Sequence, residues 1–250
     1  MPADMPETLL AVNGLGKRFG GFVALDGIDL TIAKGERLGL IGPNGSGKST
    51  LVNCLTGTLQ NETGTVTFDG KPLNGLIAHE RTRLGLARSF QLPKPFHSLN
   101  LIDNIRIPLL YTVNARHGRH HLSAAAILER CEELLTQVHL ADKARRRPRD
   151  LTQVEMRKLE LARAVATQPT LLFADEAMAG LSHSEIEEIL AVLLRLNEED
   201  ITIVLIEHIM TAVMSFSTRL AVLVAGHKIA DGPPQETIRN PEVERAYLGE

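Results

Sequence analysis

The order of apolar and polar residues predicts strands in the first third of the chain. Residues 24–32 end in an alternation of apolar and polar positions, which is the period of a half-buried strand. The apolar run 38–41 follows a glycine-containing turn and predicts a fully buried strand. After a glycine-rich loop, residues 49–55 predict a short helix, and residues 65–68 alternate again before a turn signal. The chain therefore begins with a β-rich region.

The rest of the chain changes to helices and then to alternating strands and helices. Residues 123–140 carry apolar side chains at steps of three and four, and Ser123 can cap that helix. Residues 153–168 show a second helical pattern, which ends at Pro169. Beyond it, apolar runs predict strands at 171–174, 201–206 and 219–225, with a helix at 184–196. Strands that alternate with helices favour a parallel sheet covered on both faces, so the predicted fold class is α/β.

A phosphate-binding loop is predicted directly after the buried strand at 38–41. Two glycines separated by four residues are followed by lysine and serine, which is the spacing of such a loop. The glycines let backbone N–H groups converge on phosphate oxygens at a helix N-terminus, where the dipole favours anions. Lys48 is placed to reach the β- and γ-phosphates, and the Ser49 hydroxyl to bind Mg²⁺. The loop consists of Gly42, Pro43, Asn44, Gly45, Ser46, Gly47, Lys48, Ser49 and Thr50.

Two carboxylates follow the predicted strand at 171–174. Acidic residues at the C-terminal end of a buried strand lie at the ligand crevice of an open α/β sheet. Asp175 is therefore expected to hold Mg²⁺ through water, and Glu176 to polarise the attacking water. The alternative, in which both acids only cap the next helix, has less support beside a phosphate-binding loop.

Composition narrows the possible partners. The chain has 250 residues and a formal net charge of -3, so no overall basic field attracts nucleic acid or an anionic membrane. It has 7 Phe, 2 Tyr and no Trp, too few for a surface that stacks the bases of single-stranded nucleic acid. Only Cys54 and Cys131 are present, which excludes a disulfide framework and favours a reducing compartment. No apolar stretch approaches a membrane-spanning length, so we expect any membrane role to come through a partner.

These motifs and several others in the same order resemble those of the nucleotide-binding subunit of ATP-binding cassette (ABC) transporters. Gln91 follows a predicted strand in the place of the family's Q-loop, and His208 follows another in the place of its switch histidine. Phe19 matches the aromatic residue that stacks on adenine, and residues 180–182 resemble the D-loop. The resemblance covers nearly the whole chain. It implies a P-loop NTPase core with an antiparallel β subdomain and an inserted helical subdomain, which is the ABC ATPase fold.

The resemblance also implies an organisation and a set of roles. Residues 1–250 would be a single ABC ATPase domain, with the nucleotide-binding core and its β subdomain at 1–91 and 169–250 and the helical subdomain at 92–168. ATP and Mg²⁺ would be its ligands, with the metal near Ser49, Gln91 and Asp175. Gln91 would sense the γ-phosphate, and His208 would contact it and hold the attacking geometry. Lys48 and Glu176 complete the expected catalytic set.

One motif of the family departs from its usual form. The signature segment, typically Leu-Ser-Gly-Gly-Gln, aligns with Leu151, Thr152, Gln153, Val154 and Glu155. In the family this segment presses a helix N-terminus against the γ-phosphate that a second ATPase subunit binds. Val154 places a branched Cβ at a position of close backbone approach, which is expected to obstruct that contact. In a homodimer both composite sites would carry the defect, whereas a heterodimer with an intact partner signature would keep one good site.

Within the family, the resemblance points to the ATP-binding subunits of importers for branched-chain amino acids. It rests on residues 42–57, 206–210 and the tail 238–250. The alternatives are a urea or amide importer, a lipopolysaccharide exporter, or a nucleotide-binding regulatory subunit with low turnover because of Val154. The implied partners are transmembrane permease subunits, a second ABC ATPase subunit and, indirectly, a periplasmic binding protein, without nucleic acid. The implied location is the cytoplasmic face of the inner (plasma) membrane, as a peripheral subunit.

The segment after Gln91 is a candidate for contact with the membrane subunits. In the family, their cytoplasmic coupling helices dock at this place. Phe96 and Leu99 are candidate anchors, and ordinary packing inside the helical subdomain is the alternative.

Overall fold

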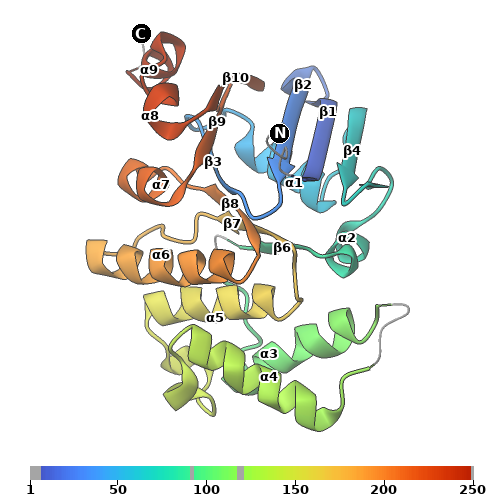
Figure 1. The fold of residues 1–250 in the computed structure, drawn as a ribbon, viewed down its shortest axis with the longest axis vertical. Coiled ribbons are helices and arrows are strands. Elements are labelled where there is room, and N and C mark those ends of the chain that lie inside the picture. Colours follow the sequence, from blue (N-terminus) through green and yellow to red (C-terminus); the bar gives the residue numbers. More distant parts are fainter. Residues whose placement is uncertain (1–6, 91–92, 117–120, 249–250) are drawn as a thin grey trace, which may run out of the picture.

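The larger of two sheets is mainly parallel and runs through the middle of the molecule (Figure 1). The computed structural model describes residues 7–90, 93–116 and 121–248. Within them the strand order is β10-β9-β3-β8-β7-β6, and only β10 is antiparallel to its neighbour. The strands are β3 Arg37–Ile41, β6 Leu86–Ser89, β7 Leu171–Asp175, β8 Thr202–Ile206, β9 Arg219–Val224 and β10 His227–Gly232. The three central strands are buried almost throughout, which explains why the sequence predicted them as apolar runs.

The smaller sheet is antiparallel and begins with a long hairpin. In the described part of the chain its order is β2-β1-β4-β5, with β1 Thr8–Phe19, β2 Phe22–Ala33, β4 Thr63–Phe68 and β5 Lys71–Pro72. Side chains from this sheet, from β3 and from the helix α1 (Lys48–Thr56) share one hydrophobic core, which includes Val12, Leu40 and Leu51. The antiparallel sheet therefore packs against the helix that follows the phosphate-binding loop, and the expected fold class is confirmed.

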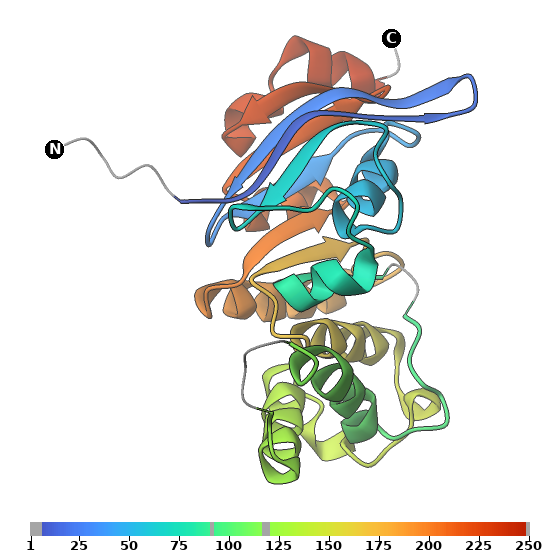
Figure 2. The same cartoon turned by 90° about the vertical axis from the view of Figure 1, so that its right-hand side faces the viewer.

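Helices cover the larger sheet and form a separate group at one end (Figure 2). In that group, α5 lies between the pair α3 and α4 on one side and β6 and α6 on the other. The remaining helices have nine or fewer residues each. The helices after α1 are α2 Ala78–Leu84, α3 Leu101–Pro108, α4 Ala124–Gln137, α5 Gln153–Val165, α6 His183–Glu198, α7 Met210–Phe216, α8 Pro234–Thr237 and α9 Pro241–Leu248, with a π-helix at Leu109–Val113.

The periodic segments formed the predicted helices. The pattern at 123–140 corresponds to α4, and the Ser123 hydroxyl caps it by accepting a hydrogen bond from the N–H of Ala126 at 3.2 Å. The short helices α2 and α7 and the strand β10 were not predicted.

Candidate functional site

The phosphate-binding loop joins β3 to α1 at the C-terminal edge of the larger sheet. Its backbone is unusual at both ends, because φ is 150° at Gly42 and 104° at Gly47. A Cβ at Gly42 would stand 2.1 Å from the carbonyl oxygen of Leu223, and one at Gly47 would stand 2.8 Å from that of Ala24. Both positions therefore require glycine for conformation and for space. α1 begins at Lys48, so a helix N-terminus meets the loop.

The Lys48 side chain folds back onto this loop. Its Nζ donates hydrogen bonds to the carbonyl oxygens of Gly42 at 2.7 Å and Pro43 at 3.0 Å. Burial lowers the pKa of Lys48, and the nearby carboxylates of Glu176 and Asp175 oppose that change. The structure therefore brings the predicted lysine and the two predicted acids into one electrostatic neighbourhood.

β7 delivers the two acids to the same edge of the sheet as the loop. Asp175 is the last residue of β7 and is buried. Glu176 has φ of 47°, which is left-handed backbone, and its N–H donates to the carbonyl oxygen of Ile206 at 2.9 Å. This turn lets Glu176 line a cavity of about 260 Å³ together with the phosphate-binding loop. Left-handed backbone at a non-glycine residue is costly, so the surrounding structure must hold Glu176 in this conformation.

An aromatic residue that the sequence analysis did not identify also lines this cavity. Phe22 contributes to the lining together with Ala24, residues 44–50 and Glu176. Phe19, the predicted platform for adenine, is not among the lining residues and is 48 % exposed, with the Lys17 ammonium 5.5 Å from its ring centre. Phe19 and Phe22 face each other across the end of the β1–β2 hairpin. The sequence signal for Phe22 was only its place just after the hairpin turn.

An ion pair that no motif predicted holds Asp175. The guanidinium of Arg88, on β6, donates to Oδ2 of Asp175 from Nη2 at 2.5 Å and from Nε at 3.1 Å. The third nitrogen, Nη1, donates to Oδ1 of Asn53 on α1 at 2.6 Å. Arg88 therefore connects the strand that carries the acids to the helix that follows the loop.

His208 lies just beyond β8 and is largely exposed. Its Nδ1 is 3.8 Å from Oε2 of Glu207, whose side chain is fully buried. Oε1 of Glu207 accepts a hydrogen bond from the N–H of Met178 at 2.8 Å, which ties the end of β8 to the turn after Glu176. Burial raises the pKa of Glu207, and its Oε2 has no hydrogen-bond partner in the part of the chain that the structure describes. Gln91, predicted for the Q-loop, lies outside the described residues.

The signature segment forms the start of α5. The Thr152 hydroxyl caps the helix by accepting from the N–H of Glu155 at 3.4 Å, and the Glu155 carboxylate accepts from the N–H of Thr152 at 2.9 Å. Lys143 forms an ion pair with Glu155. Val154 is only 8 % exposed and belongs to the larger hydrophobic core of the chain. The motif did not indicate this burial. Because Val154 is buried, a change at this residue also alters core packing.

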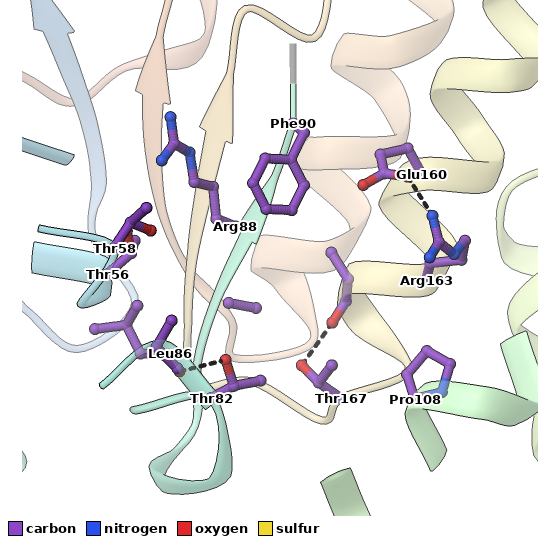
Figure 3. A pocket seen from close by; sticks show the side chains of 13 residues that line it. Thr56, Thr58, Thr82, Leu86, Arg88, Phe90, Pro108, Glu160, Arg163 and Thr167 are labelled. Atoms are coloured by element: carbon purple, nitrogen blue, oxygen red, sulfur yellow. Dashed lines mark hydrogen bonds and ion pairs between the residues drawn. The ribbon is translucent and has the colours of Figure 1, made fainter. Parts of the chain in front are cut away.

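A second cavity, of about 220 Å³, lies between the larger sheet and the helical group (Figure 3). Phe90 after β6, Pro108 of α3, and Glu160 and Arg163 of α5 all contribute to its lining. Glu160 and Arg163 form an ion pair at 2.8 Å, which Figure 3 shows on the α5 side. Burial raises the pKa of Glu160 despite that pair.

The segment after Gln91 is fastened to α5 beside this cavity. Nη1 of Arg163 donates to the carbonyl oxygen of Lys94 at 3.0 Å, and the Arg163 guanidinium lies 5.2 Å from the ring centre of Phe96. Phe96 remains 42 % exposed, and Leu99 is half-buried. Of the two candidate anchors, Phe96 therefore offers the larger free apolar surface.

The fold and the site together define a phosphate-loop nucleotide-binding protein: a strand, a glycine loop and a helix, with two acids at the end of a parallel strand that lies one strand away. The ABC transporter family model matches residues 25–179. The chain belongs to the ABC transporter family and is of its ATP-hydrolysing type.

Two curated relatives match nearly the whole chain. It is 37 % identical to LivG of Salmonella typhimurium (strain LT2), a high-affinity branched-chain amino acid transport ATP-binding protein, over 98 % of this chain and 100 % of LivG. It is 35 % identical to BraF of Pseudomonas aeruginosa, which has the same description, over 98 % of this chain and 100 % of BraF. The relatives are thus of the same length class as this chain.

Solved structures show the same fold. A nucleotide-free ATP-binding cassette from an ABC transporter superposes with a TM-score of 0.86 at 29 % identity, over 97 % of this chain and 100 % of that one. A dimeric cassette in a post-hydrolysis state, bound to ADP and Pi, superposes with a TM-score of 0.79 at 26 % identity, over 90 % of this chain and 99 % of that one. Among the described residues, no helix is both long and apolar enough to cross a membrane.

Proposed function

We propose that this chain is the ATP-binding subunit of an importer for branched-chain amino acids, in which ATP binding and hydrolysis at a dimer interface drive uptake. One observation carries the ATPase part of the proposal: the phosphate-binding loop and Glu176 line a single cavity. The substrate class is supported by LivG and BraF, which are transport ATP-binding proteins for these amino acids. A binding protein and permease subunits would select the substrate itself.

The phosphates of ATP would lie on the loop at the start of α1. The N–H groups there supply donors, and the Lys48 ammonium would exchange its carbonyl partners for β- and γ-phosphate oxygens. A cavity of about 260 Å³ is smaller than a pocket that encloses a whole ligand, so much of the nucleotide would stay uncovered by this chain. The hairpin aromatics Phe19 and Phe22 would lie against the base, and a second ATPase subunit would cover the γ-phosphate side.

The residues present suit Mg²⁺, which takes oxygen ligands. Ser49 is exposed within the cavity, and Oδ1 of Asp175 accepts no hydrogen bond from any residue that the structure describes. Ser49, Asp175 and Gln91 would hold the ion, which neutralises charge on the phosphates when bound.

Hydrolysis would proceed by attack of water on the γ-phosphorus. The bond between the γ-phosphorus and the β–γ bridging oxygen would break, and ADP would leave with that oxygen. Glu176 would accept the proton of that water, since its backbone is fixed by the hydrogen bond to Ile206. His208 would contact the γ-phosphate from the neighbouring strand end. Lys48 would stabilise the charge that spreads over the phosphate oxygens.

The second ATPase subunit would use the start of α5 from this chain. We propose that the site to which the chain donates Val154 is slower than the site built on its own Lys48. The side chain of Val154 is one reason. A second reason is that the Thr152 hydroxyl is already used as the helix cap and is less available to a phosphate. The same observation favours the second candidate function, a nucleotide-binding regulatory subunit with low turnover.

The permease would dock where residues 92–168, the proposed helical subdomain, meet the nucleotide-binding core. The cavity beside Phe90 and the exposed ring of Phe96 support this place. Docking there would make the chain a peripheral subunit at the cytoplasmic face of the membrane. Phe96→Asp should abolish co-purification with the permease, whereas Leu128→Asp, at an exposed position on α4, should not. Full recovery of the permease with Phe96→Asp would argue against docking there.

The central test uses the assembled transporter in liposomes, with labelled leucine uptake and phosphate release as the measurements. Glu176→Gln should lower ATP hydrolysis by at least about a hundredfold, the usual contribution of a general base, and should stop uptake while nucleotide still binds. Glu198→Gln, on the exposed end of α6, is the matched control and should change neither. Normal hydrolysis without leucine uptake would reject the substrate class, and normal hydrolysis in Glu176→Gln would reject the assigned base.

A further inference from the structure

Arg88 occupies a place in the site that no phosphate-loop, carboxylate or signature motif assigns. It lies on β6, the edge strand, and only 14 % of its side chain is exposed. All three guanidinium nitrogens donate to carboxylate or amide oxygens, two to Asp175 and one to Asn53. A planar fork that donates from all three of its nitrogens fixes the relative position of the groups around it.

The two groups that Arg88 joins belong to different parts of the nucleotide site. Asn53 lies on α1, the helix that carries Lys48 and Ser49 at its start, and Asp175 ends β7. With the Nη1 contact at 2.6 Å and the Nη2 contact at 2.5 Å, the guanidinium sets the spacing between that helix and the strand-end carboxylate.

The contacts on Asp175 are one-sided. Both donated hydrogen bonds reach Oδ2, and Oδ1 receives none from the described residues. A carboxylate held in this way keeps one oxygen available in a fixed orientation. Partners that orient a metal ligand from behind typically affect metal affinity by about 10- to 100-fold.

We propose that Arg88 is a positioning residue for the Mg²⁺ that accompanies ATP: it turns Oδ1 of Asp175 toward the phosphate-binding loop and ties that carboxylate to α1. This inference rests on the proposed function, because it assigns Asp175 to the metal. Charge alone would act in the opposite direction, since a guanidinium beside the ligand repels a divalent cation. The sign of the effect of replacing Arg88 therefore separates positioning from simple electrostatics.

The test measures binding of a fluorescent ATP analogue to the purified chain while Mg²⁺ is titrated, so that hydrolysis plays no part in the readout. In Arg88→Gln, the Mg²⁺ concentration for half-maximal effect should rise by about tenfold or more. Arg88→Lys keeps the charge but cannot span Asp175 and Asn53, so it should lose most of the Mg²⁺ effect as well. Arg83→Gln, an exposed arginine on α2, is the matched control.

Several outcomes would overturn the inference. Tighter Mg²⁺ binding in Arg88→Gln, or wild-type behaviour in Arg88→Lys, would show that only the charge of Arg88 matters. If Arg88→Gln fails to fold by thermal unfolding, Asn53→Ala removes one anchor of the guanidinium and should still weaken Mg²⁺ several-fold. An unchanged Mg²⁺ effect in Asn53→Ala would then count against positioning.

Asp175→Asn separates this inference from the proposed function. If Mg²⁺ strengthens analogue binding to the wild type and Asp175→Asn removes that effect, the metal assignment stands whatever Arg88 does. If the wild type shows no Mg²⁺ effect, or Asp175→Asn keeps it, the metal assignment itself is wrong.

Discussion

The phosphate-binding loop and the signature segment both place a helix N-terminus at a proposed nucleotide site, yet the chain builds them differently. The loop has glycine wherever the backbone needs it, and its lysine lines one cavity together with Glu176. The signature segment has Val154 buried in the core and a Thr152 hydroxyl committed to the helix cap. The start of α1 is therefore open to a phosphate, whereas the start of α5 makes its contacts within its own chain.

A helix N-terminus is therefore not sufficient for binding phosphate. At the loop, α1 has no side-chain cap, so its first N–H groups remain available to a ligand. At the signature segment, the reciprocal hydrogen bonds of Thr152 and Glu155 satisfy two of these groups internally. Side chains that stabilise a helix start therefore compete with an anion for the same donors.

Changes at Val154 give the largest expected effect on this comparison. In the assembled transporter, Val154→Gly should raise the rate of ATP hydrolysis, by up to about a hundredfold, the usual value of one oriented donor at a phosphoryl group. Phosphate release per transporter at saturating ATP is the measurement. An unchanged rate in Val154→Gly would remove the proposed asymmetry between the two sides.

Because Val154 is buried, a control must separate packing from phosphate contact. Val154→Ala removes the branched methyl groups and keeps the Cβ, so it should reproduce most of the loss in stability but little of the gain in rate. Chemical denaturation of both variants provides the stability measurement. Equal rate gains in the two variants would show that the methyl groups of Val154, and not its Cβ, obstruct the contact with phosphate.

The stability of α1, the helix after the phosphate-binding loop, depends on a buried arginine on α2. Nη1 of Arg81 donates to the carbonyl oxygens of Cys54 at 2.7 Å and Leu55 at 2.9 Å, near the C-terminal end of α1. Arg81→Ala leaves these carbonyls unpaired and opens a cavity, so the free energy of unfolding should fall by about 3 kcal/mol.

The matched control for that prediction lies two residues away on the same helix. Arg83 is exposed, so Arg83→Ala should change the free energy of unfolding by no more than about 0.5 kcal/mol. Denaturant titration of the purified chain measures both variants. Equal effects of the two substitutions would mean that the end of α1 does not depend on the buried cation.

The free energy of unfolding should also depend on pH through Glu207, near the nucleotide site. Burial raises the pKa of Glu207 above the ordinary value of 4.5, so the folded chain holds an extra proton just above that pH. Its contribution to stability is therefore largest at low pH and falls as the pH rises through the raised pKa. Glu207→Gln cannot titrate, so the wild type should gain stability relative to this variant as the pH is lowered.

Denaturant titrations at several pH values measure this difference. Glu198→Gln, the same substitution at an exposed position, serves as the control. A constant difference for Glu207→Gln would show that the buried carboxyl does not titrate differently in the folded chain.

The sequence predicted the parts of the site whose chemistry is local. The loop 42–50 and the pair Asp175 and Glu176 follow apolar strands that are adjacent in the sheet or separated by one strand, and this arrangement follows from the alternation of strands and helices. His208 was assigned only through the family resemblance. These residues required no knowledge of contacts distant in the sequence.

Other features depend on tertiary contacts and were not predictable from a motif. Arg88 reaches Asn53 and Asp175 across 35 and 87 positions of the sequence, and nothing near Arg88 indicates these partners. The burial of Val154 depends on how α5 packs, and the choice between Phe19 and Phe22 depends on the twist and turn of one hairpin. Periodicity can show which face of an element is apolar, but not which polar side chain crosses to another element.

At Glu176, the left-handed backbone favours a residue other than glutamate, whereas the proposed reaction requires the carboxylate. Glycine adopts φ of 47° without the cost that a side chain brings, and asparagine adopts it more readily than glutamate. A library screened only for folding should therefore enrich glycine and asparagine at this position, and those survivors would have lost the carboxylate that lines the cavity. Stability and turnover thus select different residues at one point of the chain.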